Sequence, residues 1–224
     1  MVAQFEERLF SVKPQKTLTV DQQKAAATIL GQAFAQDSFM AYVLPDAETR
    51  VQQLTKLFLP LIRCSQYHGS VNITPGGGGI LAWVPGKAFS GPIKFLELFR
   101  SRMLSVPLRL GLTAFRRFQA HDNVCEEALL RYASKGSASE DLTSKDFAYI
   151  WAVGVRPDQK GKGLGKKMIG AALEEMRQQG YATCWLRTEN PKNVGFYEHL
   201  GFQQVHTEIP AGSGQRYWLM FQNL

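Results

Sequence analysis

A glycine-rich turn joins an apolar segment to an amphipathic one and carries the clearest chemical signal of the sequence. It runs from Lys160 to Lys166 and reads Lys-Gly-Lys-Gly-Leu-Gly-Lys. Glycines let the backbone approach an oxyanion closely, and the first N–H groups of a following helix have no partner inside that helix. The helix dipole favours negative charge at the same end, and the lysines of the turn add positive potential. The turn therefore predicts a phosphate-binding site.

Two well-known phosphate motifs do not fit this turn. A P-loop needs a second glycine five residues after the first, but the fifth residue after Gly161 is Lys166. The dinucleotide pattern Gly-x-Gly-x-x-Gly fails at Lys166 when it starts at Gly161, and at Met168 when it starts at Gly163. The residues support phosphate binding without these nucleotide classes. A turn that holds no ligand is the alternative.

A second block of residues, 190–202, follows one helix-like and one strand-like segment further on. It places Asn190 at a strand end and continues into a helical pattern that reads Phe-Tyr-x-x-x-Gly-Phe from Phe196. Together, the two blocks resemble motifs A and B of the GNAT superfamily of N-acetyltransferases, in the family's order and spacing. Lys160 departs from the family pattern, which has arginine or glutamine at that position. Within the superfamily, the chain looks most like puromycin N-acetyltransferase and its relatives.

This closer likeness adds the upstream run Ala82-Trp83-Val84-Pro85 to the two motifs. It is clear over residues 147–202, patchy over 20–85 and not assignable over 88–132. Sequences of that branch carry a glutamate where this chain has Arg187. This departure limits how far the catalytic base or the substrate of the branch can be transferred to this chain.

The resemblance implies acetyl-CoA as the co-substrate. In this family two strands, here Phe147–Val155 and Ala182–Arg187, begin paired and separate at their carboxyl ends, and the gap admits the pantetheine arm. Gly154 suits a close backbone approach there, and a β-bulge at Gly154 is compatible with that role. The residues implied in cofactor binding are Val153, Gly154, Val155, Lys160, Gly161, Lys162, Gly163, Leu164, Gly165, Lys166, Asn190, Asn193 and Phe196.

The same resemblance assigns the general acid to Tyr197, since a phenol can protonate a leaving thiolate. An aromatic residue packed on the last helix is the structural alternative for Tyr197. An acceptor ammonium must also lose a proton before it attacks the thioester. Several acidic residues and one histidine are candidates for that step, and none is chosen from the sequence. They are Glu189, Glu126, Glu127, His121 and Asp146.

We expect the acceptor to be a small-molecule amine, bound near the residues that the two motifs leave unused. These are Phe34, Tyr42, Trp83 and the segment 88–132. Two alternatives remain: an amine of a protein, or a regulatory module that keeps the acyl-CoA fold without catalysis. The second alternative draws on a basic stretch from Lys87 to Arg117, which could also be a solvated helix face. Aromatic residues do not alternate with its charges, so nucleic acid is not the expected partner.

The elements expected around these residues belong to one α/β (α+β) domain over residues 1–224. Capping-box spacing from Thr19 to Gln22 predicts a helix start, and Ala47 to Gln66 predicts a second helix with a kink at Pro60. A hairpin is expected over 70–84, a helical insertion over 88–132 that breaks at Pro107 and Gly111, and a loop over 133–145. A strand, helix, strand, helix and final strand follow. The resemblance makes this a mixed central sheet with splayed strands, flanked by helices.

The composition fits such a domain. Apolar residues make up 45% of the chain, charged residues 20%, and the net charge is +7. No apolar run approaches the roughly 20 residues of a membrane span, so no membrane partner is expected. The three cysteines are widely spaced and read as reduced thiols, with no metal site expected. These features predict a cytoplasmic protein that is a monomer or a homodimer.

Overall fold

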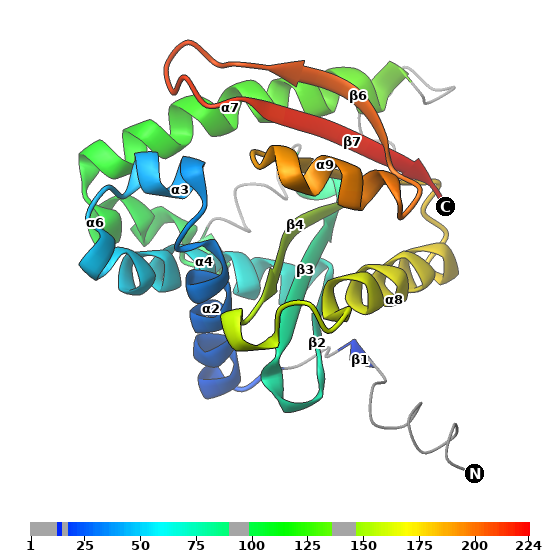
Figure 1. Ribbon diagram of the computed structural model, residues 1–224, viewed down its shortest axis with the longest axis horizontal. Helices are drawn as coiled ribbons and strands as arrows, with labels where there is room; N and C mark the ends of the chain where they lie inside the picture. Colours follow the sequence, from blue (N-terminus) through cyan, green and yellow to red (C-terminus); the bar gives the residue numbers. More distant parts are fainter. Residues whose placement is uncertain (1–12, 15–17, 90–98, 136–146) are drawn as a thin grey trace.

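A seven-stranded sheet forms the centre of the computed structural model, which describes residues 13–14, 18–89, 99–135 and 147–224. The strand order is β1-β2-β3-β4-β5-β7-β6, and Figure 1 shows the sheet between helices. The strands are β1 (Lys13–Pro14), β2 (Ser70–Ile73), β3 (Gly79–Pro85), β4 (Phe147–Val155), β5 (Thr183–Thr188), β6 (Gln203–Glu208) and β7 (Tyr217–Asn223). The sheet is mixed, since only the β4–β5 pair is parallel.

Strands β4 and β5 separate after four residue pairs. Their register runs from Phe147 opposite Thr183 to Ile150 opposite Leu186, and β4 then continues to Val155 without β5. Strand β5 stays paired with β7 instead, as far as Thr188 opposite Trp218. The splayed strands of the expected fold are therefore confirmed.

A bulge in β4 lies at the point of separation. Ala82 of β3 pairs with Ala152, whereas the next residue, Trp83, pairs with Ile150, so Trp151 has no opposite residue in β3. An extra residue bends its strand and increases the local twist, which turns β4 away from β5. The bulge thus sits at Trp151, and the alternative interpretation of Gly154 as a bulge does not hold, because Gly154 pairs regularly with Ile80.

Seven α-helices of the described residues cover the sheet. They are α2 (Val20–Phe34), α3 (Ser38–Val43), α4 (Ala47–His68), α6 (Val106–Leu110), α7 (Leu112–Lys135), α8 (Leu164–Gln178) and α9 (Pro191–Glu198). The predicted capping box is present, because the Thr19 hydroxyl accepts from the Gln22 N–H at 3.3 Å and the Gln22 side chain accepts from the Thr19 N–H at 2.9 Å. Helix α4 continues through Pro60, whose side chain is buried.

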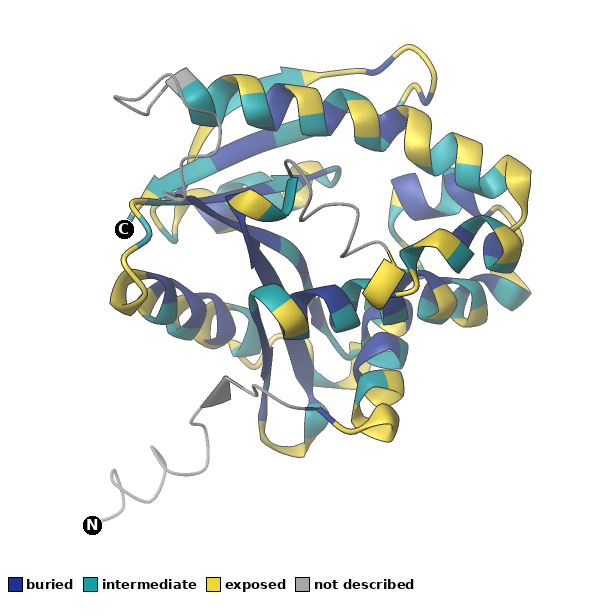
Figure 2. Cartoon of the chain, turned by 180° about the vertical axis from the view of Figure 1, so that it is seen from behind, coloured by how far each residue is buried: buried dark blue, intermediate teal, exposed yellow. Residues whose placement is uncertain are grey.

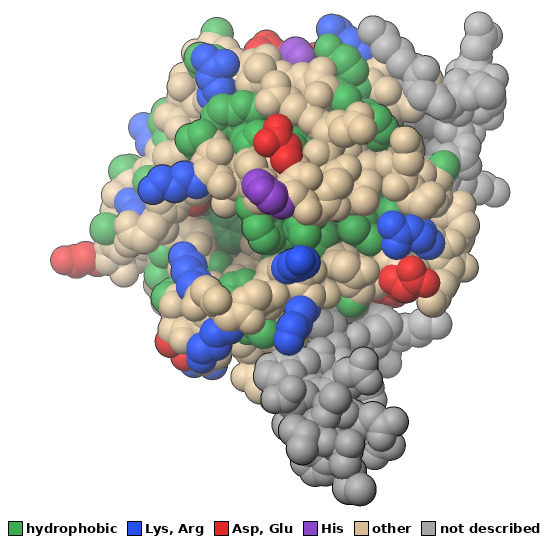
Figure 3. All heavy atoms as spheres, turned by 45° about the vertical axis from the view of Figure 1, so that its right-hand side comes forward, with side chains coloured by type: hydrophobic (Ala, Val, Ile, Leu, Met, Phe, Trp, Pro, Cys, Tyr) green, Lys and Arg blue, Asp and Glu red, His purple; other side chains and the backbone are tan. Residues whose placement is uncertain are grey.

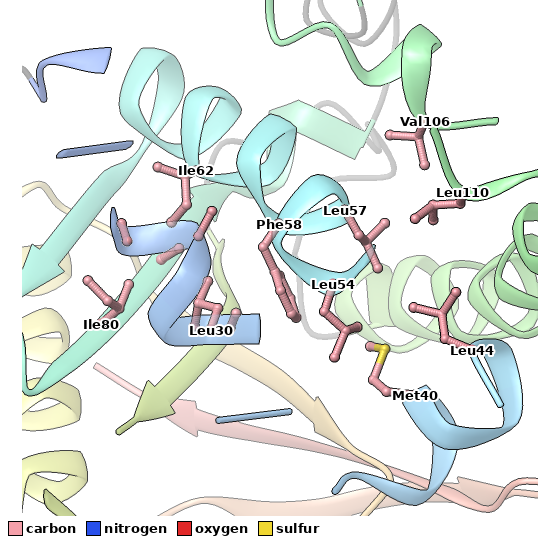
Figure 4. Close-up of a cluster of buried hydrophobic side chains, with 14 of the residues drawn as sticks. Leu30, Met40, Leu44, Leu54, Leu57, Phe58, Ile62, Ile80, Val106 and Leu110 are labelled. Carbon is pink, nitrogen blue, oxygen red and sulfur yellow. The ribbon is translucent and has the colours of Figure 1, made fainter. Parts of the chain in front are cut away.

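Buried side chains gather in three clusters around the sheet. Figure 4 shows the first, which contains Leu30 of α2, Leu54 and Phe58 of α4, and Ile80 of β3. The second lies under α8 and α9, and the third between α7 and β7. Figure 2 shows buried strands between helices that are buried on one face and exposed on the other. Helices and side chains pack against both faces of the sheet. This close packing keeps β4 and β5 apart where they separate.

The segment expected as a helical insertion contains short helices and the long helix α7. Gly111 (φ +84°) separates α6 from α7, as predicted. Pro107 occupies the first turn of α6, so it starts a helix instead of breaking one. Residues 90–98 and most of the expected loop over 133–145 lie outside the described residues, and α7 extends to Lys135. Helix α3 and strand β6 were not predicted from the sequence. None of the described helices is long and apolar enough to cross a membrane.

Candidate active site

A cavity of about 480 Å³ lies where β4 and β5 separate. Its walls come from the end of α2, from α4, from the 103–107 segment, from α7 and from the first turns of α9. Aromatic and aliphatic side chains make up most of the lining, with a few charged residues at one side. Figure 3 shows a hollow lined by hydrophobic side chains, with Lys and Arg side chains around it. A cavity of this size and polarity suits a small organic ligand.

One edge of β4 remains open beside this cavity. From Trp151 to Val155 the edge that faced β5 has no strand partner among the described residues. Val153, Gly154 and Val155 all lie on this free stretch, as the sequence predicted for the segment that receives an extended ligand arm. Gly154 has a further reason to be glycine, because a Cβ there would lie 2.7 Å from Cδ2 of Leu30 on α2.

The glycine turn folds as an uncapped helix start. Gly161 (φ +81°) and Gly163 (φ +72°) adopt left-handed backbone conformations, which favour glycine. Gly163 is the N-cap of α8 and supplies no side-chain hydrogen bond; the N–H of Lys167 is the first to bond back, to the Gly163 carbonyl at 3.1 Å. The N–H groups of the first turn are therefore available to an anion.

Lysines of the turn surround this helix start. Lys160, Lys162 and Lys166 are exposed, and Lys162 Nζ donates to Gln159 Oε1 at 2.9 Å. Their charges add to the positive end of the α8 dipole. Leu164 is half-buried and opens the helix. The turn thus has the backbone donors and the charge that a pyrophosphate needs.

The two sequence motifs meet in space. Asn190 caps α9 by accepting from the Lys192 N–H at 3.0 Å, and Asn193 Nδ2 donates to Thr188 Oγ1 at 3.3 Å at the end of β5. Phe196, 40% exposed, lies next to the turn, because a Cβ on Gly165 would be 3.5 Å from its ring carbon Cζ. Residues predicted from two separate blocks therefore flank the same opening between β4 and β5.

Tyr197 lies at the inner end of that opening. It lines the cavity, is only 9% exposed, and its hydroxyl makes no hydrogen bond to the part of the chain that the structure describes. Burial, with a smaller contribution from the charge of Glu189, raises the pKa of the Tyr197 phenol. The phenol is therefore held in its neutral form, which can donate a proton.

Five polar residues form a hydrogen-bonded cluster at the cavity. Arg187 donates from Nη2 to Asp122 Oδ1 at 2.7 Å and from Nε to Glu189 Oε1 at 3.0 Å. The ring of His121 is completely buried, with Nε2 3.4 Å from Glu189 Oε1 and Nδ1 2.8 Å from Ser213 Oγ. Arg187, where the sequence departs from the puromycin branch, is thus the centre of a buried ion-pair network.

Two carboxyl groups at the cavity have opposite pKa shifts. Burial alone raises the pKa of Glu189, but the Arg187 charge and the His121 hydrogen bond outweigh it, so the net pKa is lowered. Burial raises the pKa of Asp37, and the nearby Glu189 charge raises it further against backbone hydrogen bonds that lower it. Glu189 is therefore a fixed negative charge, whereas Asp37 takes up a proton more readily than an ordinary aspartate.

His121, Cys125 and Glu189 also place possible metal-ligating atoms within 4.8 Å of one another. The Arg187 guanidinium binds the same Glu189 oxygen as His121, and its charge opposes a divalent cation there. Burial raises the pKa of the Cys125 thiol to about 12, which keeps it protonated at neutral pH. We therefore describe these residues as a hydrogen-bonded cluster. All three cysteines are buried, and none of them is in a disulfide.

Only one of the three residues expected to contact the acceptor lines the cavity. Phe34 does, with its ring 5.2 Å from that of Phe58. The Tyr42 hydroxyl donates to the Gly212 carbonyl at 2.8 Å, and Arg117 lies 5.5 Å above the Tyr42 ring, so this side chain ties α3 to the β6–β7 loop. Tyr42 does not line the cavity.

Trp83 packs away from the cavity, against α8. Its side chain is fully buried and its Nε1 donates to Glu175 Oε2 at 3.4 Å. Every residue of β3 is buried, so the sequence had no polar alternation to show which side chains face which side. The placement of Trp83 does not support its predicted contact with the acceptor.

The acids that do line the cavity include two that the sequence analysis did not single out. Asp37 caps α3 by accepting from the Met40 N–H at 3.0 Å, and Asp122 pairs with Arg187. Asp37 precedes Ser38 at a helix start, a signal that indicates a cap but not a cavity. Of the candidate bases, Glu189 and Glu126 line the cavity and Glu127 is exposed, whereas Asp146 lies outside the described residues.

Sequence comparison finds the acetyltransferase (GNAT) family, whose model matches residues 122–202. A mycothiol acetyltransferase of Saccharomonospora viridis is 37% identical over 67 residues, 29% of this chain and 22% of that protein. A ribosomal-protein alanine N-acetyltransferase of Escherichia coli is 34% identical over 62 residues, 27% of this chain and 42% of that protein. The match thus spans less than two thirds of the length of these relatives. The family model covers the second half of α7, the glycine turn and α9.

The likeness in fold extends much further than the likeness in sequence. A solved acetyltransferase structure from Corynebacterium glutamicum, described as a histone acetyltransferase and related acetyltransferase, superimposes with a TM-score of 0.56. The superposition covers 95% of each chain at 16% identity, which shows a common fold. Family pattern and fold together support the GNAT acetyltransferase superfamily.

Proposed function

We propose that this member of the GNAT acetyltransferase superfamily transfers the acetyl group of acetyl-CoA to the amine of a small molecule. One observation carries the proposal. The free edge of β4 over Val153–Val155, the uncapped start of α8 and the buried hydroxyl of Tyr197 surround one opening. A thioester with an extended arm and a pyrophosphate needs these three features together.

The residues fit acetyl-CoA in shape and in charge. Backbone groups of Val153 and Val155 on the free edge can hydrogen-bond an extended pantetheine arm as another strand would. The first N–H groups of α8, with Lys160 and Lys166 beside them, suit the pyrophosphate. Asn190, Asn193 and Phe196 line the side of the opening that α9 forms. These contacts would hold the co-substrate with its thioester toward Tyr197.

Acetyl-CoA supplies an activated acyl group as a thioester. The chain supplies a dry pocket, backbone N–H donors on β4 that can polarise a carbonyl, and a proton on the Tyr197 hydroxyl. The raised pKa keeps the Tyr197 phenol protonated at neutral pH, so its proton is available when the carbon–sulfur bond breaks and negative charge develops on the sulfur. Tyr197 is therefore the proposed general acid.

The shape of the cavity favours a small acceptor. It is enclosed by α2, α4 and α7, and a volume of about 480 Å³ takes a small organic molecule more readily than a protein segment. The relatives' names give one of each kind, mycothiol and a ribosomal protein. The finer likeness to puromycin N-acetyltransferase stays part of this proposal, and the comparisons add no specific support for it. A single domain over residues 1–224, with residues 88–132 as an insertion in it, is likewise part of this proposal.

Calorimetric titration of acetyl-CoA, followed by a thiol-release assay over a panel of amines, tests the proposal. We expect binding of both CoA and acetyl-CoA, and release of free thiol that depends on the amine. The Tyr197→Phe variant should bind acetyl-CoA like the wild type and turn over more slowly. Absence of acetyl-CoA binding contradicts the proposal, and binding without any transfer favours a regulatory acyl-CoA-binding module.

A further inference from the structure

The charge of the cavity is opposite to that of the protein. The chain carries a net charge of +7. In contrast, the charged side chains among the described residues that line the cavity are Asp37, Asp122, Glu126, Glu189 and Arg187. Because Arg187 is ion-paired with Asp122 and Glu189, the cavity retains a clear excess of negative charge. A low-dielectric pocket focuses this potential onto whatever ligand enters.

Two of these acids, Asp37 and Glu189, come from different elements of the fold. Asp37 stands at the start of α3, and the ring of Phe39, two residues on, packs 4.1 Å from the ring of His121. His121 Nε2 in turn lies 3.4 Å from Glu189 Oε1. The chain Asp37–Phe39–His121–Glu189 therefore brings the two carboxyl groups to the same part of the cavity. The Glu189 charge is near enough to raise the pKa of Asp37.

Within the described residues, Arg187 and His121 bind the Glu189 carboxylate, and neither forms an ion pair with Asp37. Arg187 and His121 both contact Oε1 of Glu189, and Oε2 has no hydrogen bond or ion pair within the described residues. Asp37 accepts a hydrogen bond from a neutral backbone N–H at 3.0 Å. Two carboxylates in a partly buried site repel each other unless a positive group lies between them. The positive charge of a bound ligand would offset this repulsion.

The remaining walls select what such a cation is attached to. The rest of the lining is mostly aromatic and aliphatic, with Phe34, Phe58, Phe115, Phe118, Met103 and Leu57 among its members. Aromatic rings favour apolar and aromatic bodies and tolerate a cation over their faces. A ligand that carries a carboxylate as well as the cation would meet the acidic side chains of Asp122 or Glu126.

We propose that the acceptor is an organic cation. Its ammonium group binds between Asp37 and Glu189, and its apolar body, about the size of an aromatic ring, packs against the aromatic and aliphatic lining. This inference rests on the proposed function and names the substrate class of that site. It excludes amino acids and acidic peptides, and it makes Glu189 a fixed anchor that Arg187 and His121 hold in place.

Calorimetry without acetyl-CoA tests this with three ligands that share one body: 2-phenylethylamine, 2-phenylethanol and phenylalanine. At pH 7 the amine is a cation, the alcohol is neutral and the amino acid carries an added carboxylate. We expect the amine to bind at least about tenfold more tightly than either of the others, because a charge-assisted hydrogen bond is roughly twice as strong as a neutral one. Equal affinities, or no binding of the amine up to about 10 mM, overturn the inference.

Matched variants locate the cation. Asp37→Asn keeps a good helix cap at α3 and should weaken the amine about tenfold while leaving the alcohol unchanged. Asp21→Asn removes the same charge from an exposed position in α2 and should change neither. Glu189→Gln tests the second carboxyl group of the proposed site in the same way. An unchanged affinity of the amine in both cavity variants overturns the inference.

The two proposals fail separately. If the amine binds but acetyl-CoA does not, or no thiol is released, the cation site stands and the proposed transfer fails. If thiol is released as readily with phenylalanine as with 2-phenylethylamine, the transfer stands and the cation site fails.

Discussion

Arg187 Nε lies 3.0 Å from Glu189 Oε1, two residues further along the same chain. Arg187 lies in β5, Glu189 is the first residue after this strand, and both side chains line the cavity. Arg187, the position at which the sequence differs from the expected puromycin-branch pattern, therefore binds the Glu189 carboxylate at the cavity.

Replacement of Arg187 by methionine should cost stability. Arg187 and Glu189 are 17% and 12% exposed, and a buried charge left without its partner destabilises by roughly 3–5 kcal/mol. Urea unfolding at pH 7 measures the change. Arg177→Met is the control, since its pair with Glu174 is exposed and such pairs contribute about 0–1 kcal/mol. Equal losses in the two variants would contradict a buried network.

The same pair sets a pH dependence. The lowered pKa of Glu189 means that its contribution to stability is complete above the unfolded value of about 4.3 and is lost as the pH falls through the lower folded value. The difference in unfolding free energy between wild type and Arg187→Met should therefore shrink below about pH 4. A difference that stays constant down to pH 3 argues against the assignment.

Asp37→Asn should have the opposite effect at neutral pH. Because the pKa of Asp37 is raised in the folded state, the ionised carboxylate lowers the free energy of unfolding above that pKa. This loss of stability is absent below the unfolded pKa of about 3.9. The asparagine variant keeps the cap and removes the charge, so its urea midpoint at pH 7 should exceed that of the wild type. The gain should vanish near pH 3.5, and a lower midpoint at pH 7 would refute the prediction.

Tyr197→Phe should lower turnover without changing acetyl-CoA affinity. General acid catalysis contributes about 10²–10⁴-fold, and we expect a loss at the lower end of this range because water can protonate a thiolate. Tyr181→Phe is the matched control, as Tyr181 packs on the buried Trp83 away from the cavity. Thiol release measures both variants. Similar turnover in the two would remove Tyr197 from the mechanism.

Gly163→Ala should weaken CoA binding more than it weakens the fold. A Cβ there meets no atom within 4 Å, so the cost is the left-handed backbone at φ +72°, about 1–2 kcal/mol. Strain of this kind shifts the first turn of α8 and its N–H groups. Gly170→Ala, in the middle of the same helix and equally free of contacts, should instead stabilise by up to about 1 kcal/mol. Calorimetry with CoA and urea unfolding separate the two effects, and equal CoA affinities in both variants would contradict the site.

The sequence by itself determined the parts of the site that depend on local structure. Glycines at 161 and 163, the Asn190 cap and Tyr197 lie within about 40 residues of one another, and their turn and helix geometry follows from backbone preferences and capping. The strand and helix order from Phe147 onward was predictable for the same reason, apart from β6, whose residues are mostly polar or half-buried.

Only the tertiary structure decided the acceptor side. His121 meets Glu189 across 68 positions of the chain, and Tyr42 meets Gly212 across 170, and such contacts arise from packing of separate elements. Trp83 and Phe34 are both apolar residues with a regular pattern around them, yet one faces α8 and the other the cavity. A strand buried on both faces has no alternation to read, so which side chains line the cavity was fixed only when α2, α4 and α7 closed over the sheet.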